Sequence, residues 1–184
     1  MPNCPRCNAL MDDDELACPG CGHRLKEDSV YRAHYEPREL LDLGLSAKFV
    51  EFVFLDPKPK RIRNWCEPRE SGWPCFVPKS VSAVYPLWTR NADVFAVWVR
   101  DGRTEFVRLC HDNPEPQVVA RNEQGLLADL FLALLGTDEP LKNLRKLAGV
   151  AGFRHMDELE QWVQKNGSAR DFRERWLRFV ESLT

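Results

Sequence analysis

The sequence has neither a long apolar run nor an excess of charge of one sign. No unbroken apolar run is longer than that of residues 94–99, and the richer stretch 126–135 is interrupted by Asp129, whereas a membrane-spanning helix needs about 20 apolar residues. The 26 lysines and arginines are offset by 28 aspartates and glutamates, so overall positive charge cannot drive nucleic-acid binding. The beginning, MPNCPRC, has no apolar segment typical of a secretory signal. We therefore expect a cytoplasmic protein that does not bind membranes.

The sequence also lacks an even set of cysteines. Seven cysteines without an export signal indicate a reducing compartment, in which thiols bind metals or pack in the core rather than form disulfides. The chain has 184 residues, of which 29% are charged and 43% hydrophobic. These values are typical of a globular protein with one domain of ordinary size and a small appendage.

Four of the cysteines form two CxxC pairs near the beginning of the sequence. Each pair makes a tight turn that can direct two thiolates at one ion, and two pairs supply the four soft ligands that tetrahedral zinc prefers. Because the protein fills all four positions, we expect a structural zinc rather than a catalytic one. The predicted zinc ligands are Cys4, Cys7, Cys18 and Cys21.

This segment resembles the short zinc-ribbon module over residues 3–26. The resemblance implies a small hairpin held by the metal, and we expect so short a piece to fold only when the metal binds. Residues 1–28 carry three more acidic than basic side chains, a balance that repels phosphate. We therefore expect the hairpin to contact a basic protein surface, with plain docking as the alternative. The candidate contact residues are Asp12, Asp13, Asp14 and Glu15.

Strand patterns dominate the middle of the sequence. Asp101 and Gly102 separate two β-rich runs and are a favourable pair for a type I′ hairpin turn, so an antiparallel meander is predicted. The run 94–99 is apolar on both faces, which predicts a central strand covered on each side. We expect strands at 75–77, 81–88, 94–100, 103–110 and 117–120.

Helix patterns precede and follow these strands. A helix is expected to begin at Pro37 and to end or be interrupted at Gly44. A second helix, capped by Asn122 and ended by Gly136, has a wide apolar stripe that we expect to pack across the sheet. Three further helices are expected at 139–148, 157–165 and 169–183, the last one capped by Ser168.

The predicted fold class is α+β, with an antiparallel sheet packed by helices. We expect a zinc ribbon at 1–27, an α+β domain at 28–136 and a C-terminal helical extension at 137–184.

The segment 56–74 contains four prolines and little periodicity, which predicts a long loop that is functional or mobile. Within it, residues 57–69 have four more basic than acidic side chains. A basic loop with a tryptophan can bind an acidic protein or RNA, and an ordinary solvated loop is the alternative. The candidate contact residues are Lys58, Lys60, Arg61, Arg63 and Trp65.

The remaining cysteines point to structure rather than to catalysis. Cys66, Cys75, Cys110 and His111 have no spacing typical of a compact metal site, so we expect buried or idle thiols, with a second metal site as the alternative. Cys110 and His111 are neighbours in a predicted strand, where their side chains point to opposite faces and cannot form a catalytic pair directly. The sequence has no phosphate-binding glycine loop, GxSxG elbow or HExxH motif.

Tryptophans and arginines also allow two interpretations. Trp88 and Trp98 could stack on bases, but tryptophans in strands are more often core residues. In the segment 169–183 an aromatic stripe is expected to face the core, with arginines on the solvated side. Those arginines are Arg170, Arg173, Arg175 and Arg178.

The segment 81–136 resembles the SUKH superfamily, the small α+β immunity proteins of bacterial toxin systems and their relatives. The likeness extends over residues 37–136 and rests on a Leu-Trp pair entering the meander, a small acidic turn, a hairpin and the entry into a closing helix. The residues that carry it are Leu87, Trp88, Asn91, Asp93, Val119, Ala120, Leu126, Leu127 and Phe131. Asn91-Ala92-Asp93 replaces the glycine-rich GD segment typical of that superfamily, and the ribbon and C-terminal helices lie outside its pattern.

The leading hypothesis is a non-catalytic protein-binding module, a bacterial immunity or adaptor protein that neutralises a toxin by covering its active site. Acidic groups suit this role, because many such toxins are nucleases or deaminases with basic clefts. The alternative is a nucleic-acid- or ribosome-associated zinc-ribbon protein that uses residues 57–69. No acid–base constellation indicates an enzyme, so we expect zinc as cofactor and no small-molecule substrate.

Overall fold

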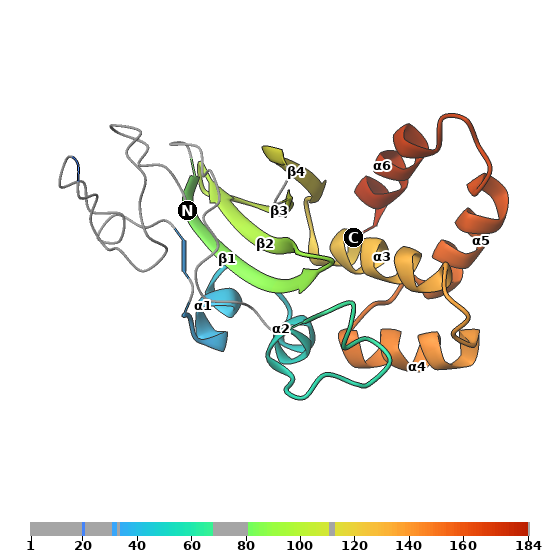
Figure 1. Ribbon diagram of the computed structural model, residues 1–184, viewed down its shortest axis with the longest axis horizontal. Helices are drawn as coiled ribbons and strands as arrows, with labels where there is room; N and C mark the ends of the chain where they lie inside the picture. Colours follow the sequence, from blue (N-terminus) through green and yellow to red (C-terminus); the bar gives the residue numbers. More distant parts are fainter. Residues whose placement is uncertain (1–19, 21–30, 33, 68–80, 111–112, 184) are drawn as a thin grey trace.

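The computed structural model describes residues 20, 31–32, 34–67, 81–110 and 113–183. The four predicted zinc ligands, the acidic residues 12–15, the expected strand at 75–77 and His111 lie outside these described residues. The described helices and strands are segregated along the chain, as is typical of an α+β fold (Figure 1). In chain order they are α1 (Pro37–Asp42), α2 (Ala47–Phe54), β1 (Val81–Arg90), β2 (Asp93–Arg100), β3 (Arg103–Cys110), β4 (Asn113–Ala120), α3 (Glu123–Leu135), α4 (Leu141–Ala151), α5 (Met156–Asn166) and α6 (Phe172–Ser182).

The four described strands form one antiparallel sheet in the order β1-β2-β3-β4, which confirms the predicted meander. Asp101 and Gly102 form the β2–β3 turn with φ values of 50° and 72°, as a type I′ turn requires. Asn91 and Ala92 form the β1–β2 turn with φ values of 52° and 65°. Because a left-handed alanine costs about 1 kcal/mol, the β1–β2 turn is strained at Ala92.

Both faces of the sheet are buried. One face joins α2 in the main hydrophobic cluster, where Phe49 contacts Trp88 and Phe106 with ring centroids 6.4 and 6.0 Å apart. The other face carries a smaller cluster that includes Trp98. Trp88 and Trp98 are each 1% exposed, and every residue from 94 to 98 is buried. The expected core tryptophans and the central strand covered on both sides are therefore confirmed.

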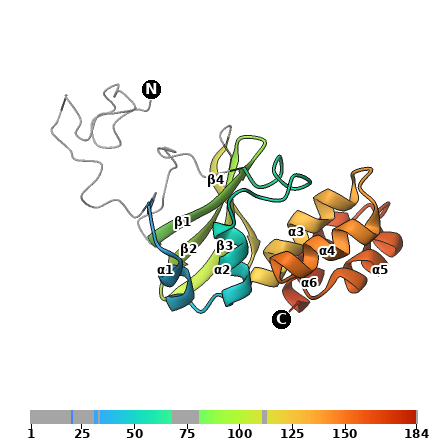
Figure 2. The same ribbon diagram turned by 90° about the horizontal axis from the view of Figure 1, so that it is seen from below.

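Helix α3 connects the sheet to the C-terminal helices. Its N-cap is Asn122, as predicted, and the Asn122 side-chain oxygen accepts a hydrogen bond of 2.8 Å from the backbone N–H of Gly125. The helix lies beside β4 at one end of the sheet and contacts α4, α5 and α6 on its other sides (Figure 2). This arrangement explains why the apolar residues of α3 are buried around most of its circumference.

The C-terminal helices share the main hydrophobic cluster with the sheet and α2. The amide nitrogen of Asn122 donates to the carbonyl of Leu183 at 2.6 Å. The side chain of Gln124, 2% exposed, donates to the carbonyl of Gly152 and accepts from the backbone N–H of Arg154, each at 3.0 Å. These bonds attach residues 137–183 to the N-terminal turn of α3.

One predicted helix boundary is confirmed and another is wrong. Gly44 interrupts the first helical segment as predicted, with φ +83°. The predicted cap at Ser168 is wrong, because α6 begins at Phe172 after Asp171. Residues 166–172 instead form successive turns, closed by hydrogen bonds from Ala169 to Asn166 and from Phe172 to Ala169.

In the part of the chain that is described, no helix reaches the length and apolar character that crossing a bilayer demands.

Candidate functional site

Lys58, at the beginning of the predicted basic loop, is used by the fold itself. Its Nζ lies 2.6, 2.7 and 3.1 Å from the carbonyl oxygens of Phe52, Val53 and Leu55. It also lies 5.2 Å from the centre of the Phe52 ring. These carbonyls lie at the C-terminal end of α2, where few backbone N–H donors remain and the helix dipole is negative. Lys58 therefore caps α2, and contacting a partner would require it to leave this position.

The middle of the same loop is anchored in the core. Ile62 and Cys66 are 1% and 0% exposed, and the carbonyl of Ile62 accepts hydrogen bonds from the N–H groups of Trp65 and Cys66. Glu67 then exchanges two backbone hydrogen bonds with Thr89 of β1, at 3.0 and 3.2 Å. Residues 58–67 are thus held against the last residues of β1. The spacing of Ile62 and Cys66, four residues apart, is the sequence signal for this helical turn.

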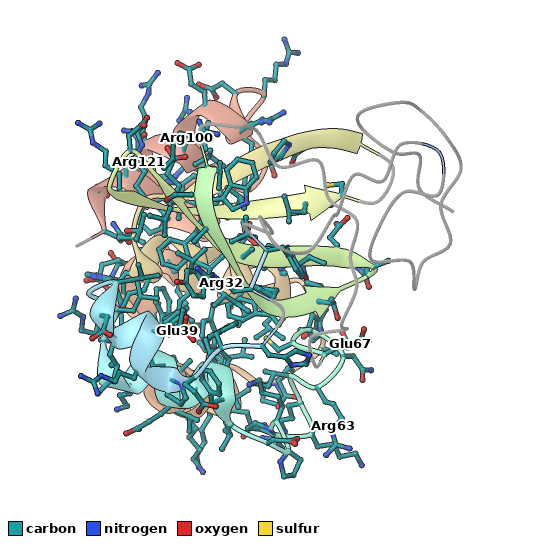
Figure 3. The ribbon with its side chains drawn as sticks, turned by 90° about the vertical axis from the view of Figure 1, so that its left-hand side faces the viewer. Arg32, Glu39, Arg63, Glu67, Arg100 and Arg121 are labelled. Atoms are coloured by element: carbon teal, nitrogen blue, oxygen red, sulfur yellow. The ribbon has the colours of Figure 1, made fainter. Side chains whose placement is uncertain are left out.

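The other cations of the loop have different surroundings. Arg61 forms an ion pair with Glu139 at 3.0 Å, whereas Lys60 and Arg63 are exposed. Figure 3 shows Arg63 and Glu67 on the same side of the molecule, with the Arg63 side chain directed away from the ribbon. Lys60 and Arg63 are therefore the loop cations best placed to contact a partner.

Trp65 lines a pocket of about 590 Å³ at the end of the sheet. We call it the sheet-end pocket. The residues around it come from the loop, from β1, β2 and β3, from the strained β1–β2 turn and from α3. They are Trp65, Arg90, Asn91, Asp93, Arg108, Cys110 and Ala133. Among the described residues that the sequence analysis selected for binding, Trp65 alone lines this pocket.

Arg90 forms the inner wall of the sheet-end pocket. Its Nη2 donates to Asp129 Oδ2 at 3.0 Å, and the two side chains are 12% and 22% exposed. Its guanidinium carbon lies 4.4 Å from the centre of the Phe95 ring, a cation–π contact. Nη1 is buried and has no acceptor among the described residues. The guanidinium is thus fixed by α3 and by the sheet together.

Arg108 forms the more exposed wall, with 39% of its side chain accessible. Its Nε donates to Asp93 Oδ2 at 2.7 Å. Burial acts to lower the pKa of Arg108, but the hydrogen bond and the charge of Asp93 outweigh it and raise the pKa above its ordinary value. Arg108 therefore carries its charge at every physiological pH, and Asp93 holds it in position.

Two thiols lie beside or behind the pocket. Burial raises the pKa of Cys66 to about 12. Burial first, and then the neighbouring Asp93, also raise the pKa of Cys110, although Arg108 opposes them. Since the thiolate is the reactive form, neither thiol is an activated nucleophile near neutral pH.

The alternative of a second metal site involves residues that the structure describes only in part. Cys66 is buried, as expected, whereas Cys75 and His111 lie outside the described ranges. Within those ranges no three or more His, Cys, Asp or Glu side chains gather closely enough to hold a metal ion.

The sheet-end pocket can accept a side chain from another molecule. Trp65 supplies apolar surface, and Arg108 with the nearby loop cations supplies hydrogen-bond donors for a carboxylate. Asp93 and Asp129 balance the two pocket arginines, so the excess positive charge lies on the loop rather than in the pocket. In comparisons with known proteins, no family model, no curated protein and no solved structure matches this chain.

Proposed function

We propose that the chain is a non-catalytic protein-binding module, a bacterial cytoplasmic immunity or adaptor protein that neutralises a toxin by covering its active site. The observation that carries this proposal is the sheet-end pocket, where Trp65 of a firmly held basic loop lies beside Arg90 and Arg108. Tryptophan and arginine are the residue types that most often dominate the binding energy of protein interfaces. A loop anchored in the core also loses little conformational entropy when it binds.

The order of helices and strands supports the same proposal. Two short helices, α1 and α2, precede a four-stranded antiparallel meander, and α3 follows it directly. The meander followed by a closing helix is the order that the SUKH resemblance implies for residues 81–136. Fold alone does not determine function, so the proposal rests on the pocket, with the fold as additional support.

The charges at the site favour a protein that presents an acidic side chain, rather than nucleic acid, as the partner. Lys58 caps α2, and Arg61 pairs with Glu139, which leaves Lys60 and Arg63 as the outward cations among the described loop residues. Nucleic-acid affinity grows with each phosphate that a protein neutralises, and these two described cations beside a charge-balanced pocket neutralise few. An acidic side chain on a partner protein needs only one or two such donors.

The decisive experiment for the function is co-expression with the toxin encoded beside the gene. We expect the chain to restore growth of cells that produce the toxin, and to form a complex with the purified toxin. Reversing Lys60 and Arg63 to glutamate should weaken this complex by about tenfold or more, because close charge pairs contribute to interface affinity. The matched control is Arg103→Glu, an exposed charge reversal at the opposite end of the sheet, which should change affinity less than about twofold.

Two results would contradict the proposed function. One is a toxin that stays fully active at saturating concentrations of the chain. The other is tight RNA or DNA binding by the purified chain that falls steeply with salt, which would support the nucleic-acid-associated alternative.

We also propose that Cys4, Cys7, Cys18 and Cys21 hold one structural zinc ion, and that residues 12–15 contact a basic surface of the partner. The donor chemistry supports the first proposal, because four thiolates in two CxxC pairs suit tetrahedral zinc. Denaturation of the purified chain in the presence of a zinc-sensitive dye should release one zinc per chain. Release of none would contradict the zinc proposal, and release of two would point to a second site that includes other cysteines.

A further inference from the structure

Helices α5 and α6 pack against each other through an aromatic cluster that reaches the surface. Trp162 lies 5.2, 5.1 and 5.3 Å, centre to centre, from the rings of Phe172, Trp176 and Phe179. Trp176 is 8% exposed, whereas the other three rings are only half-buried. The stripe that the sequence analysis assigned to the core is thus partly accessible to other molecules.

A pocket of about 610 Å³ lies over this cluster. We call it the α5–α6 pocket. Trp162 and Phe179 supply its aromatic surface, and Gln161 and Asn166 contribute polar groups. Its charged residues are Lys165, Arg175 and Arg178 on the basic side and Glu158 and Asp171 on the acidic side.

The polar side of the α5–α6 pocket is held in place by hydrogen bonds. Arg175 donates from Nε to Asp171 Oδ1 at 2.8 Å and from Nη1 to Asn166 Oδ1 at 3.1 Å. Asn166 is 6% exposed, and its amide nitrogen donates to the carbonyl of Trp162 at 2.9 Å. The hydrogen bond from Arg175 lowers the pKa of Asp171, so the pair stays charged at neutral pH. The guanidinium of Arg175 is therefore already oriented beside the aromatic surface.

We infer that the α5–α6 pocket binds a segment of a partner protein in which an acidic side chain lies next to an apolar one. The lining of the pocket has three basic side chains and two acidic ones, so the pocket itself has a small positive excess that favours an acidic group. The apolar side chain would cover Trp162 and Phe179, and the acidic one would meet Lys165, Arg175 or Arg178. This site is separate from the sheet-end pocket, and the inference holds whether or not the chain neutralises a toxin.

The same residues are poorly suited to single-stranded nucleic acid. Such binding depends on aromatic faces that are open to bases, but Phe179 stacks on Trp162 at an interplanar angle of 26° and two further rings contact the same indole. Glu158 and Asp171 also interrupt the row of cations that a phosphate backbone would follow. A protein segment needs only one acidic contact and an apolar edge.

The test is selection of phage-displayed random peptides on the immobilised full chain. The selection is repeated after removal of every peptide that also binds the double variant Lys165→Glu/Arg178→Glu. Both positions are exposed, so the variant should fold, which circular dichroism will verify. We expect the surviving peptides to share an acidic residue adjacent to a leucine or an aromatic residue.

The selected peptide is then titrated against single variants by fluorescence polarisation. Lys165→Glu and Arg178→Glu should each weaken binding by about fivefold or more. The matched control is Arg173→Glu, which reverses an exposed charge on the same helix outside the pocket and should weaken binding less than about twofold. Replacing the apolar residue of the peptide by serine should abolish detectable binding.

Four results overturn the inference. They are the absence of surviving peptides, survival of basic peptides, an equal loss of affinity in Arg173→Glu, and tighter binding of an oligothymidine than of the selected peptide. None of them depends on the toxin experiment, so the two proposals can fail separately.

Discussion

The two pockets differ in how the chain assembles them. The sheet-end pocket takes residues from position 65 to position 133, and the α5–α6 pocket takes them from 158 to 179. The ion pairs at the two pockets also differ in exposure. Arg90 and Asp129 are 12% and 22% exposed, whereas Arg178 and Glu174 are 72% and 67% exposed. Solvent and salt screen exposed pairs far more than buried ones. The first pocket is therefore a product of the whole fold, and the second is a surface feature of two helices.

The largest expected effect at neutral pH tests the buried pair. Arg90→Ala removes the partner of Asp129 and the contact with Phe95, so we expect the free energy of unfolding to fall by about 3 kcal/mol. Urea denaturation measures this change. Arg175→Ala in the α5–α6 pocket is the comparison, and its unfolding midpoint should stay close to that of the unmodified chain. Equal losses of unfolding free energy in the two variants would show that the fold depends on both pockets to the same degree.

Gly125→Ala should destabilise α6 more than the sheet. A Cβ atom added at Gly125 would lie 2.6 Å from Val180 Cγ1 and 2.8 Å from Ala120 Cβ, so Gly125→Ala must displace α6. We expect a loss of about 2 kcal/mol, with faster hydrogen exchange in α6 than in β1–β3. Gly149→Ala in α4 is the control, because nothing lies within 4 Å of its new Cβ and alanine favours a helix. Hydrogen exchange that becomes equally fast in β1–β3 and in α6 would contradict this localisation.

The buried thiol behind the sheet-end pocket predicts a pH dependence. Burial raises the pKa of Cys66 from 9.0 to about 12, so the unfolded chain releases this proton first as the pH rises. The contribution of Cys66 to stability is therefore complete below pH 9 and is lost between pH 9 and 12, with a slope of about 1.4 kcal/mol per pH unit. In Cys66→Ala the stability should decline less steeply over this range, as measured by urea denaturation. Identical slopes would mean that the thiol ionises freely in the fold.

The smallest expected effect concerns the β1–β2 turn beside the sheet-end pocket. Ala92→Gly relieves a left-handed alanine but adds flexibility to the unfolded chain, so we expect a net stabilisation of about 0.5 kcal/mol. The reverse change in the second hairpin, Gly102→Ala, should destabilise by about 1 kcal/mol. Thermal unfolding of both variants compares the turns directly. A destabilised Ala92→Gly would show that the alanine side chain has a packing role.

The sheet could be predicted because its signals are local. Asp101-Gly102 specifies the second hairpin through its own backbone preferences, and the two-faced apolar pattern of 94–99 marks a central strand. Asn122 likewise identifies the beginning of α3. The beginning of α6 was missed, because residues 166–172 form turns that Ser168 alone does not indicate.

The candidate sites could be predicted only in part, because they depend on pairings across the chain. Arg90 and Asp129 are 39 residues apart, and no local pattern indicates that they meet. Charge counting detected the basic loop but could not show that Lys58 caps a helix. Helical spacing likewise identified the aromatic stripe of α6, but it could not show how much of that stripe a neighbouring helix leaves accessible.

The two hydrogen bonds of Asn122 make the C-terminus part of the same cooperative unit as the central helix. One side chain caps α3 through its oxygen and holds the carbonyl of Leu183, 61 residues away, through its nitrogen. A truncated chain that ended before α4 would lose this carbonyl and expose apolar surface of α3. Because global unfolding destroys both pockets, a ligand bound at either one protects the other from global unfolding by mass action.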